Sequence, residues 1–167
     1  MSVFLTAILP LRRTLVPAVG VLLLCACAQA VRHDEFRPYD ETADASAAIA
    51  AALADNPAGK RILLTFGGNW CSDSRALESR YQDPALAALL EREFQVVHID
   101  VGMSHRNLDI AARYDNPIDK GIPSVVLLDP AGRTLFVNHG RLSSADRMSN
   151  AAIMDFFTRL AADGRVD

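Results

Sequence analysis

A short apolar run that leads directly into two glycines and a cysteine most constrains how this chain can fold. Residues 62–66 (ILLTF) are bounded by turn residues, which predicts a buried strand. Residues 67–71 (GGNWC) follow at once, and a helix is expected to begin near Ser72. A thiol at this boundary lies near the unpaired N–H groups and the positive dipole end of the helix, which favour the thiolate.

The rest of the chain alternates between helical and strand patterns. An alanine-rich segment predicts a first helix from about Asp44 to Asp55, and residues 72–93 are helical with a kink or a fresh start at Pro84. The pattern further predicts a strand over 94–101, a short helix over 107–114, a hairpin of 124–128 with 134–137, and a final helix over about 143–162 capped by Ser143 or Ser144. Parallel strands linked by helices, followed by a hairpin and a last helix, indicate an α/β layer fold.

The first thirty residues have the order of an export signal. Arg12 and Arg13 precede an apolar stretch over 15–24, and small residues follow it. The stretch is broken by Pro17 and is shorter than the roughly 20 residues of a spanning helix, so membrane contact is expected only through the leader or a lipid anchor. Residues 24–27 (LCAC) resemble a lipobox, in which Cys27 would be lipidated, whereas the small residues after it suit plain cleavage; the leader fits both fates.

These features predict an exported, periplasmic protein with one globular domain. We expect a leader over 1–30, an extended tether over 31–41 and the domain over 42–167. The formal net charge is only −3 and no basic block occurs, which argues against nucleic acid as a partner. Two of the three cysteines lie in the leader, so Cys71 is expected to be the only thiol of the mature domain, without an internal disulfide.

Two motifs, about fifty residues apart, resemble those of the thioredoxin superfamily. The first is residues 64–74 (LTFGGNWC, two further residues and Ser74), and the second is residues 121–129 (GIPSVVLLD). The resemblance is closest to exported bacterial thioredoxin-like proteins with a Gly-x-Asn-Trp-Cys motif. It implies a thioredoxin-like fold with a central mixed β-sheet flanked by helices on both faces. It also implies that Pro123 is a cis-proline facing Cys71. Trp70, Ile122 and Arg75 are the candidate substrate-binding residues, with packing at the rim of the site as the alternative for Trp70 and a solvated helix position as the alternative for Arg75.

The chain departs from the family pattern at three positions. Ser74 replaces the second cysteine, so no internal disulfide can release a bound substrate. Thr65 lies where thioredoxins often have a buried acid, and a hydroxyl cannot accept a proton near neutral pH, so proton transfer would depend on water or substrate. Asp73 brings a negative charge that opposes thiolate formation, while the helix end and Arg75 favour it.

The sequence therefore favours a monothiol thiol–disulfide oxidoreductase or isomerase. In this interpretation Cys71 is the nucleophile, Ser74 donates a hydrogen bond to it, and Pro123 shapes the groove. The expected partners are protein or small-molecule thiols and disulfides together with an external thiol reductant, and no cofactor is expected. The alternative is a non-catalytic binding or assembly module on the same fold.

Two minor alternatives involve the same thiol. Cys71 could form a sulfenic acid with peroxide. It could also bind copper or zinc with Met103 and His105, but their spacing matches no metal motif, and no metal site is expected.

Overall fold

The computed structural model describes residues 36–166 of the 167-residue chain. The predicted leader with Cys27, and residues 31–35 of the predicted tether, lie outside the described residues. None of the helices in the described part is long and apolar enough to cross a membrane.

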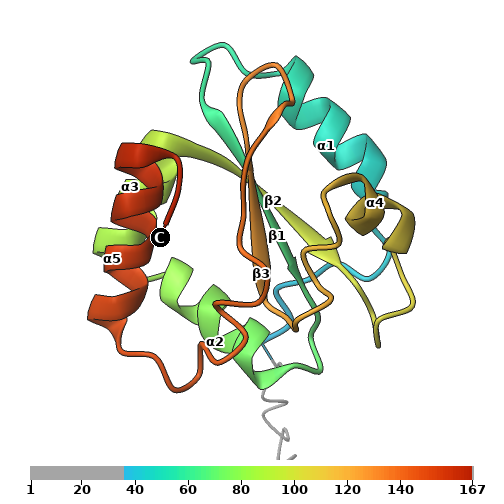
Figure 1. The fold of residues 1–167 in the computed structure, drawn as a ribbon, viewed down its shortest axis with the longest axis vertical. Coiled ribbons are helices and arrows are strands. Elements are labelled where there is room, and N and C mark those ends of the chain that lie inside the picture. The colour runs from blue at the N-terminus through green and yellow to red at the C-terminus, as the bar shows by residue number, and fades with distance from the viewer. Residues whose placement is uncertain (1–35, 167) are drawn as a thin grey trace, which may run out of the picture. The chain divides into compact units, whose positions relative to one another are not determined.

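A four-stranded mixed sheet forms the centre of the domain (Figure 1). Its order is β2 (Phe94–Asp100), β1 (Arg61–Gly67), β3 (Ser124–Leu128) and β4 (Thr134–Val137). β1 pairs with β2 in parallel and with β3 in antiparallel fashion, and β3 and β4 form the antiparallel hairpin. The central position of β1 places the end of this strand, and the cysteine turn after it, between β2 and β3.

Helices cover both faces of the sheet (Figure 1). α1 (Ala45–Ala54) and α4 (Leu108–Arg113) pack on one face, and α2 (Ser72–Tyr81), α3 (Pro84–Glu93) and α5 (Asn150–Asp163) pack on the other. This arrangement confirms the predicted α/β fold with a mixed sheet between two helical layers.

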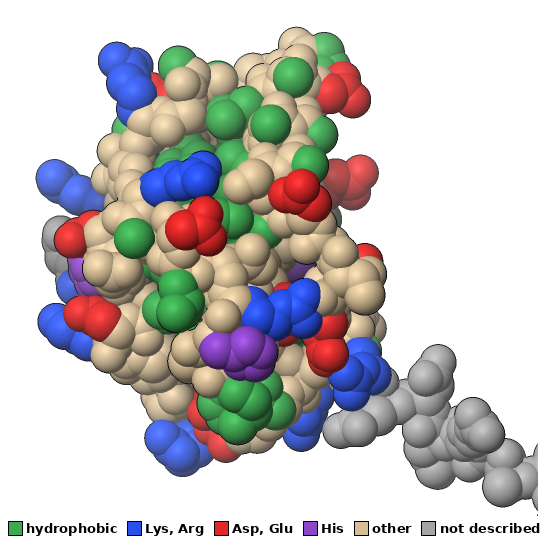
Figure 2. Space-filling model, turned by 90° about the vertical axis from the view of Figure 1, so that its right-hand side faces the viewer, with side chains coloured by type: hydrophobic (Ala, Val, Ile, Leu, Met, Phe, Trp, Pro, Cys, Tyr) green, Lys and Arg blue, Asp and Glu red, His purple; other side chains and the backbone are tan. Residues whose placement is uncertain are grey.

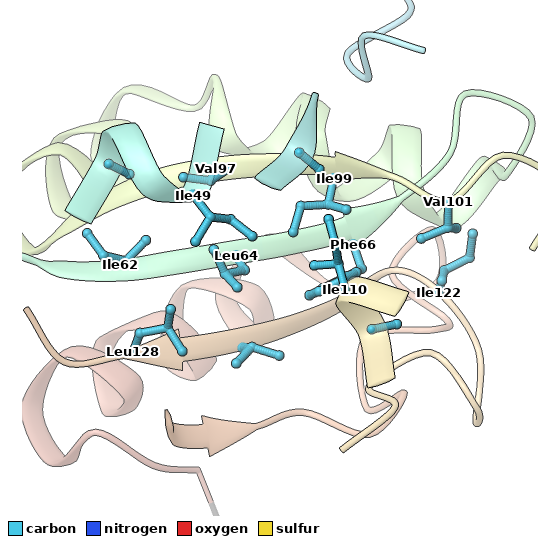
Figure 3. Close-up of a cluster of buried hydrophobic side chains, with 14 of the residues drawn as sticks. Ile49, Ile62, Leu64, Phe66, Val97, Ile99, Val101, Ile110, Ile122 and Leu128 are labelled. Carbon is cyan, nitrogen blue, oxygen red and sulfur yellow. The ribbon is translucent and has the colours of Figure 1, made fainter. Parts of the chain in front are cut away.

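The alternation of β1 divides its side chains between two hydrophobic clusters. Ile62, Leu64 and Phe66 point toward α1 and α4, where they are fully buried (Figure 3). Leu63 points to the opposite face and packs with Leu77 of α2 and with residues of α3 and α5. Because both faces of β1 are buried, its sequence is almost uniformly apolar rather than alternating.

Proline and serine set the helix boundaries on the second face. The helical region over 72–93 consists of two helices, because Asp83 caps α3 by accepting hydrogen bonds from Ala85 and Leu86 N–H groups, and Pro84 occupies the first turn. The prediction for the last helix was wrong at its start: α5 begins at Asn150 and is capped by Ser149.

The segment before α5 forms turns because it is bonded to α2. The Asp146 N–H donates to the Asp73 carboxylate at 3.0 Å, and the Arg80 guanidinium donates to the Met148 carbonyl at 3.0 Å. Ser143 and Ser144 therefore lie in turns rather than capping a helix.

The tether prediction is wrong at its C-terminal end. Tyr39 is only 2% exposed, and its backbone is hydrogen-bonded to the side chain of Asn69 in the cysteine turn. The packed domain therefore includes residues that precede residue 42.

Candidate active site

Cys71 occupies the N-cap position of α2, directly after the turn that follows β1. The turn is closed by a hydrogen bond from the Cys71 N–H to the Gly68 carbonyl at 3.1 Å. Gly67 is required at the end of β1, because a Cβ there would overlap the ring of Tyr39. The Cys71 residue is 8% exposed and is the only cysteine among the described residues.

The loop before β3 faces the thiol. The Ile122–Pro123 peptide bond is cis, and the Cys71 thiol donates a hydrogen bond to the Ile122 carbonyl with an Sγ···O distance of 3.6 Å. Ile122 is also buried and packs in the same cluster as Cys71. The two motifs found in the sequence are thus brought into contact across β1 and β3.

The predicted hydrogen bond from Ser74 to Cys71 is not formed. Ser74 is fully buried on the inner side of α2, and its Oγ has no hydrogen-bond partner among the residues that the structure describes. The hydrogen bond of the thiol is directed to the Ile122 carbonyl instead. Ser74 therefore occupies the position of the second cysteine of the family motif but makes no hydrogen bond with Cys71.

Trp70 and Arg75, which flank Cys71 in the sequence, border an open hollow of about 520 Å³, whereas neither Cys71 nor Ile122 lines it. The Trp70 residue is 50% exposed, and its indole Nε1–H donates to the Gly102 carbonyl at 2.5 Å. The Arg75 guanidinium donates to the Asn69 carbonyl at 2.5 Å. Met103, His105 and Arg106 also line the hollow. On the face of the molecule in Figure 2, acidic and basic side chains are interspersed and form no basic stripe.

Asp73 is turned toward the loop before α5. It accepts the Asp146 N–H, and burial together with the neighbouring Asp146 side chain raises the pKa of its carboxyl group above the ordinary value. Its contact is therefore with this loop.

One candidate ligand atom of the metal hypothesis is already hydrogen-bonded. His105 Nδ1 accepts a hydrogen bond from the Met103 N–H in an exposed loop. Among the described residues no group of three or more His, Cys, Asp or Glu side chains could hold a metal ion.

Sequence reasoning missed a buried polar cluster beneath the thiol. The Glu78 carboxylate, 4% exposed, accepts a hydrogen bond from the Tyr39 hydroxyl at 3.0 Å and is paired with His98 Nε2 at 2.8 Å. Near it, the Thr65 and Tyr81 hydroxyls lie 3.3 Å apart. Helical spacing could have revealed Glu78, because it continues the inward face that begins with Ser74 and Leu77.

Asn69 has a clear structural role in this turn. Its amide oxygen accepts the Tyr39 N–H at 3.1 Å, and its amide nitrogen donates to the Tyr39 carbonyl at 2.8 Å and to Glu41 at 3.0 Å. Asn69 therefore fastens the segment before α1 to the cysteine turn.

A sheet of this topology, with a helix-capping cysteine opposite a cis-proline loop, defines a thioredoxin-like domain. The thioredoxin-like family model matches residues 40–130, and the chain belongs to this family of thiol–disulfide oxidoreductases. A search of curated proteins finds no match.

Two solved structures are similar to the chain. The disulphide isomerase from Xylella fastidiosa Temecula1 is 42% identical, with a TM-score of 0.72, and the match covers 74% of this chain and 95% of that one. A thioredoxin from Thermus thermophilus is 22% identical, with a TM-score of 0.50, over 71% of this chain and 85% of that one, and shows the shared fold.

Proposed function

We propose that this protein is an exported monothiol thiol–disulfide oxidoreductase or isomerase that works through a mixed disulfide on Cys71. The observation that carries the proposal is the contact between the Cys71 thiol and the Ile122 carbonyl of the cis-proline loop, in a domain with no second described cysteine. The 42% identity to a disulphide isomerase supports the same class of reaction.

The reaction has two exchange steps. The Cys71 thiolate attacks a substrate disulfide, a Cys71–substrate S–S bond forms, and the other substrate sulfur leaves as a thiolate that takes up a proton. An external thiol, or a second thiol of the same substrate, then loses its proton and attacks the substrate sulfur of this mixed disulfide. Cys71 is released as a thiolate, and the substrate sulfur ends in a new disulfide. When an external thiol attacks, the substrate sulfur ends in a disulfide with that thiol. When a second thiol of the substrate attacks, the substrate gains a different internal disulfide and is thereby isomerised.

The geometry supports this chemistry in three ways. The N-terminus of α2 stabilises negative charge on the Cys71 sulfur. Trp70, which precedes Cys71, and Arg75 border an open hollow, which suits a polypeptide or a small thiol compound. Cys71 is only 8% exposed, so a substrate sulfur must reach a largely covered thiol, and the side chains around it would select substrates by shape.

Turnover of a mixed disulfide tests the proposal. The protein is incubated with a peptide that carries a cysteine- or glutathione-derived mixed disulfide, in the presence of the free small thiol, and release of the peptide thiol is followed. We expect the wild-type protein and a Ser72→Ala control to accelerate release, and Cys71→Ser to abolish the acceleration. Equal rates for wild type and Cys71→Ser would refute the proposed activity.

Export is the second part of the proposal, and it rests on the order of charged, apolar and small residues in 1–30. Fractionation of cells that express the full chain should place the protein outside the cytoplasm. Metabolic labelling with a fatty acid distinguishes the two fates, because only a lipoprotein would carry the label at Cys27. A full-length protein confined to the cytoplasm would contradict export.

The limited exposure of Cys71 favours one alternative, a binding or assembly module without turnover. In that case Cys71→Ala would retain the cellular role and the partners of the wild-type protein. Loss of that role in Cys71→Ala would exclude the alternative.

A further inference from the structure

A buried carboxylate lies on the face of the sheet onto which Thr65 projects. Thr65 and His98 are paired in the parallel ladder between β1 and β2, so both side chains project toward α2. Glu78 projects inward from α2 onto this face and is 4% exposed. A charged side chain is buried this completely only when it is paired.

Two residues distant in the sequence hold the Glu78 carboxylate. One oxygen accepts the Tyr39 hydroxyl at 3.0 Å, and the other lies 2.8 Å from His98 Nε2. Tyr39 and His98 also pack edge to face with ring centroids 6.0 Å apart. Glu78, Tyr39 and His98 therefore form one rigid unit, which we call the Glu78 cluster.

One side of the Glu78 cluster reaches the underside of the active-site turn. The Tyr39 hydroxyl and Ser74 Oγ both lie less than 3.0 Å from the position that a Cβ on Gly67 would occupy. Ser74 is one turn of α2 after Cys71, and Glu78 is about two turns after it, or roughly 10 Å along the helix axis. A charge change at Glu78 is therefore close enough to act on the Cys71 sulfur through the protein interior.

The other side of the Glu78 cluster reaches solvent. The His98 side chain is 37% exposed and borders a hollow of about 660 Å³ together with Phe36, Tyr81 and Gln82. His98 can therefore exchange its proton with water while Glu78 stays buried.

The protonation of His98 decides the charge of the Glu78 cluster. Burial alone would lower the pKa of His98, but the hydrogen bond to Glu78 and its negative charge together raise it above the ordinary value. The other titratable groups that face Glu78 are Tyr39 and Tyr81, and burial, with the charge of Glu78 added, raises the pKa of both phenols well above 10.0. His98 is therefore the group in the cluster whose ordinary pKa lies nearest to neutral pH, and Glu78 raises it from there.

We propose that Glu78 and His98 are positioning residues for the Cys71 reaction, acting on the thiolate from beneath the active-site turn. While His98 is protonated the pair is neutral, and the Cys71 thiolate forms without opposition from it. Once His98 loses its proton to water, Glu78 carries an unopposed negative charge that disfavours the thiolate. This proposal rests on the proposed function in one respect, namely that Cys71 is the reacting group.

The test is the pH profile of Cys71 alkylation in the full-length protein. The protein is treated with iodoacetamide at pH values from about 5 to 10, and the modified Cys71 peptide is quantified by mass spectrometry, which separates it from Cys25 and Cys27. A unit charge roughly 10 Å away, at an effective dielectric constant of about 20, changes the equilibrium between thiol and thiolate by about tenfold, so alkylation rates should change by up to about tenfold.

Two variants are expected to give opposite signatures. Glu78→Gln should raise the alkylation rate at about pH 8 and leave it nearly unchanged at about pH 6, because the neutral amide removes the charge that opposes the thiolate. His98→Asn should lower the rate at about pH 6 and leave it nearly unchanged at about pH 9, because Glu78 is then unopposed at every pH. Glu91→Gln, an exposed charge change of equal size on α3, should follow the wild-type profile.

The pH profile of the wild-type protein is a separate test, which does not depend on whether the variants fold. Titration of His98 should make the logarithm of the rate rise by less than one unit per pH unit in the neutral range. A slope of one throughout, or two variant profiles that shift in the same direction, would overturn the proposal. The alkylation readout does not depend on turnover, so a protein inactive on mixed disulfides could still show the coupling, and an active one could lack it.

Discussion

Gly67→Ala should destabilise the protein through the side chain of Tyr39. A Cβ at residue 67 would lie less than 3.0 Å from the Tyr39 ring and 2.9 Å from Ser74 Oγ, and atoms at such distances must separate. The backbone of Gly67 is ordinary extended strand, so steric overlap rather than backbone strain determines the outcome.

The overlap can be relieved in two ways, and the cheaper one sets the cost. If the Tyr39 ring moves, its buried hydrogen bond to Glu78 is lost, which costs about 1.5–3 kcal/mol for a charged acceptor. If β1 moves instead, overpacking in a filled core costs about 1–3 kcal/mol. Alanine recovers roughly 0.4–1 kcal/mol by restricting the unfolded chain, so the free energy of unfolding should fall by about 1–2 kcal/mol.

Urea denaturation followed by circular dichroism measures this change. Gly68→Ala is the matched control, because its Cβ would meet the half-exposed indole of Trp70. Moving that ring breaks only its exposed hydrogen bond to the Gly102 carbonyl, so the expected loss is at most about 1 kcal/mol. Gly67→Ala with wild-type stability, or with a smaller loss than Gly68→Ala, would show that the packing of Tyr39 against β1 is not as described.

Three further predictions concern the same region. Asn69→Ala should lower the free energy of unfolding by about 2 kcal/mol and speed hydrogen exchange at Tyr39, since both backbone groups of Tyr39 lose their partner; unchanged exchange there would contradict the clamp. Glu78 raises the pKa of His98 in the folded protein, so the stabilisation from this pair should be complete below the unfolded-state pKa of about 6.5 and be lost as pH rises through the folded-state pKa. Urea midpoints should show this loss in the wild-type protein but not in His98→Asn. Ser74→Ala should raise the free energy of unfolding by about 1 kcal/mol, because it removes a buried hydroxyl without a described partner and favours the helix, and a clear loss of stability would indicate a partner for that hydroxyl.

Local patterns were sufficient to predict the central part of the fold. The strand over 62–66 and the helix start after Cys71 each depend on residues close in sequence, and the structure contains both. The cis bond at Pro123 was implied by the resemblance to the thioredoxin superfamily, and the structure contains it as well. The order of the strands follows from their pairing across β1.

Long-range contacts determine what the sequence did not reveal. The Tyr39–Glu78 hydrogen bond joins residues 39 positions apart, and the Asp146–Asp73 bond joins residues 73 positions apart. The first places part of the predicted tether in the core, and the second delays the start of α5. No local pattern around Tyr39 or Asp146 reports these partners, whereas the inward position of Glu78 was visible in helical spacing.

The clamp between Asn69 and Tyr39 affects where the domain should be cut for biochemical work. A recombinant form that begins at residue 42, where the first helix pattern suggests a boundary, would keep every helix and strand of Figure 1. It would nevertheless lack the ring that covers Glu78, and water would reach that carboxylate. Such a truncated protein could fold well and still give a misleading thiol reactivity, so its pH profile should be measured on a form that retains Tyr39.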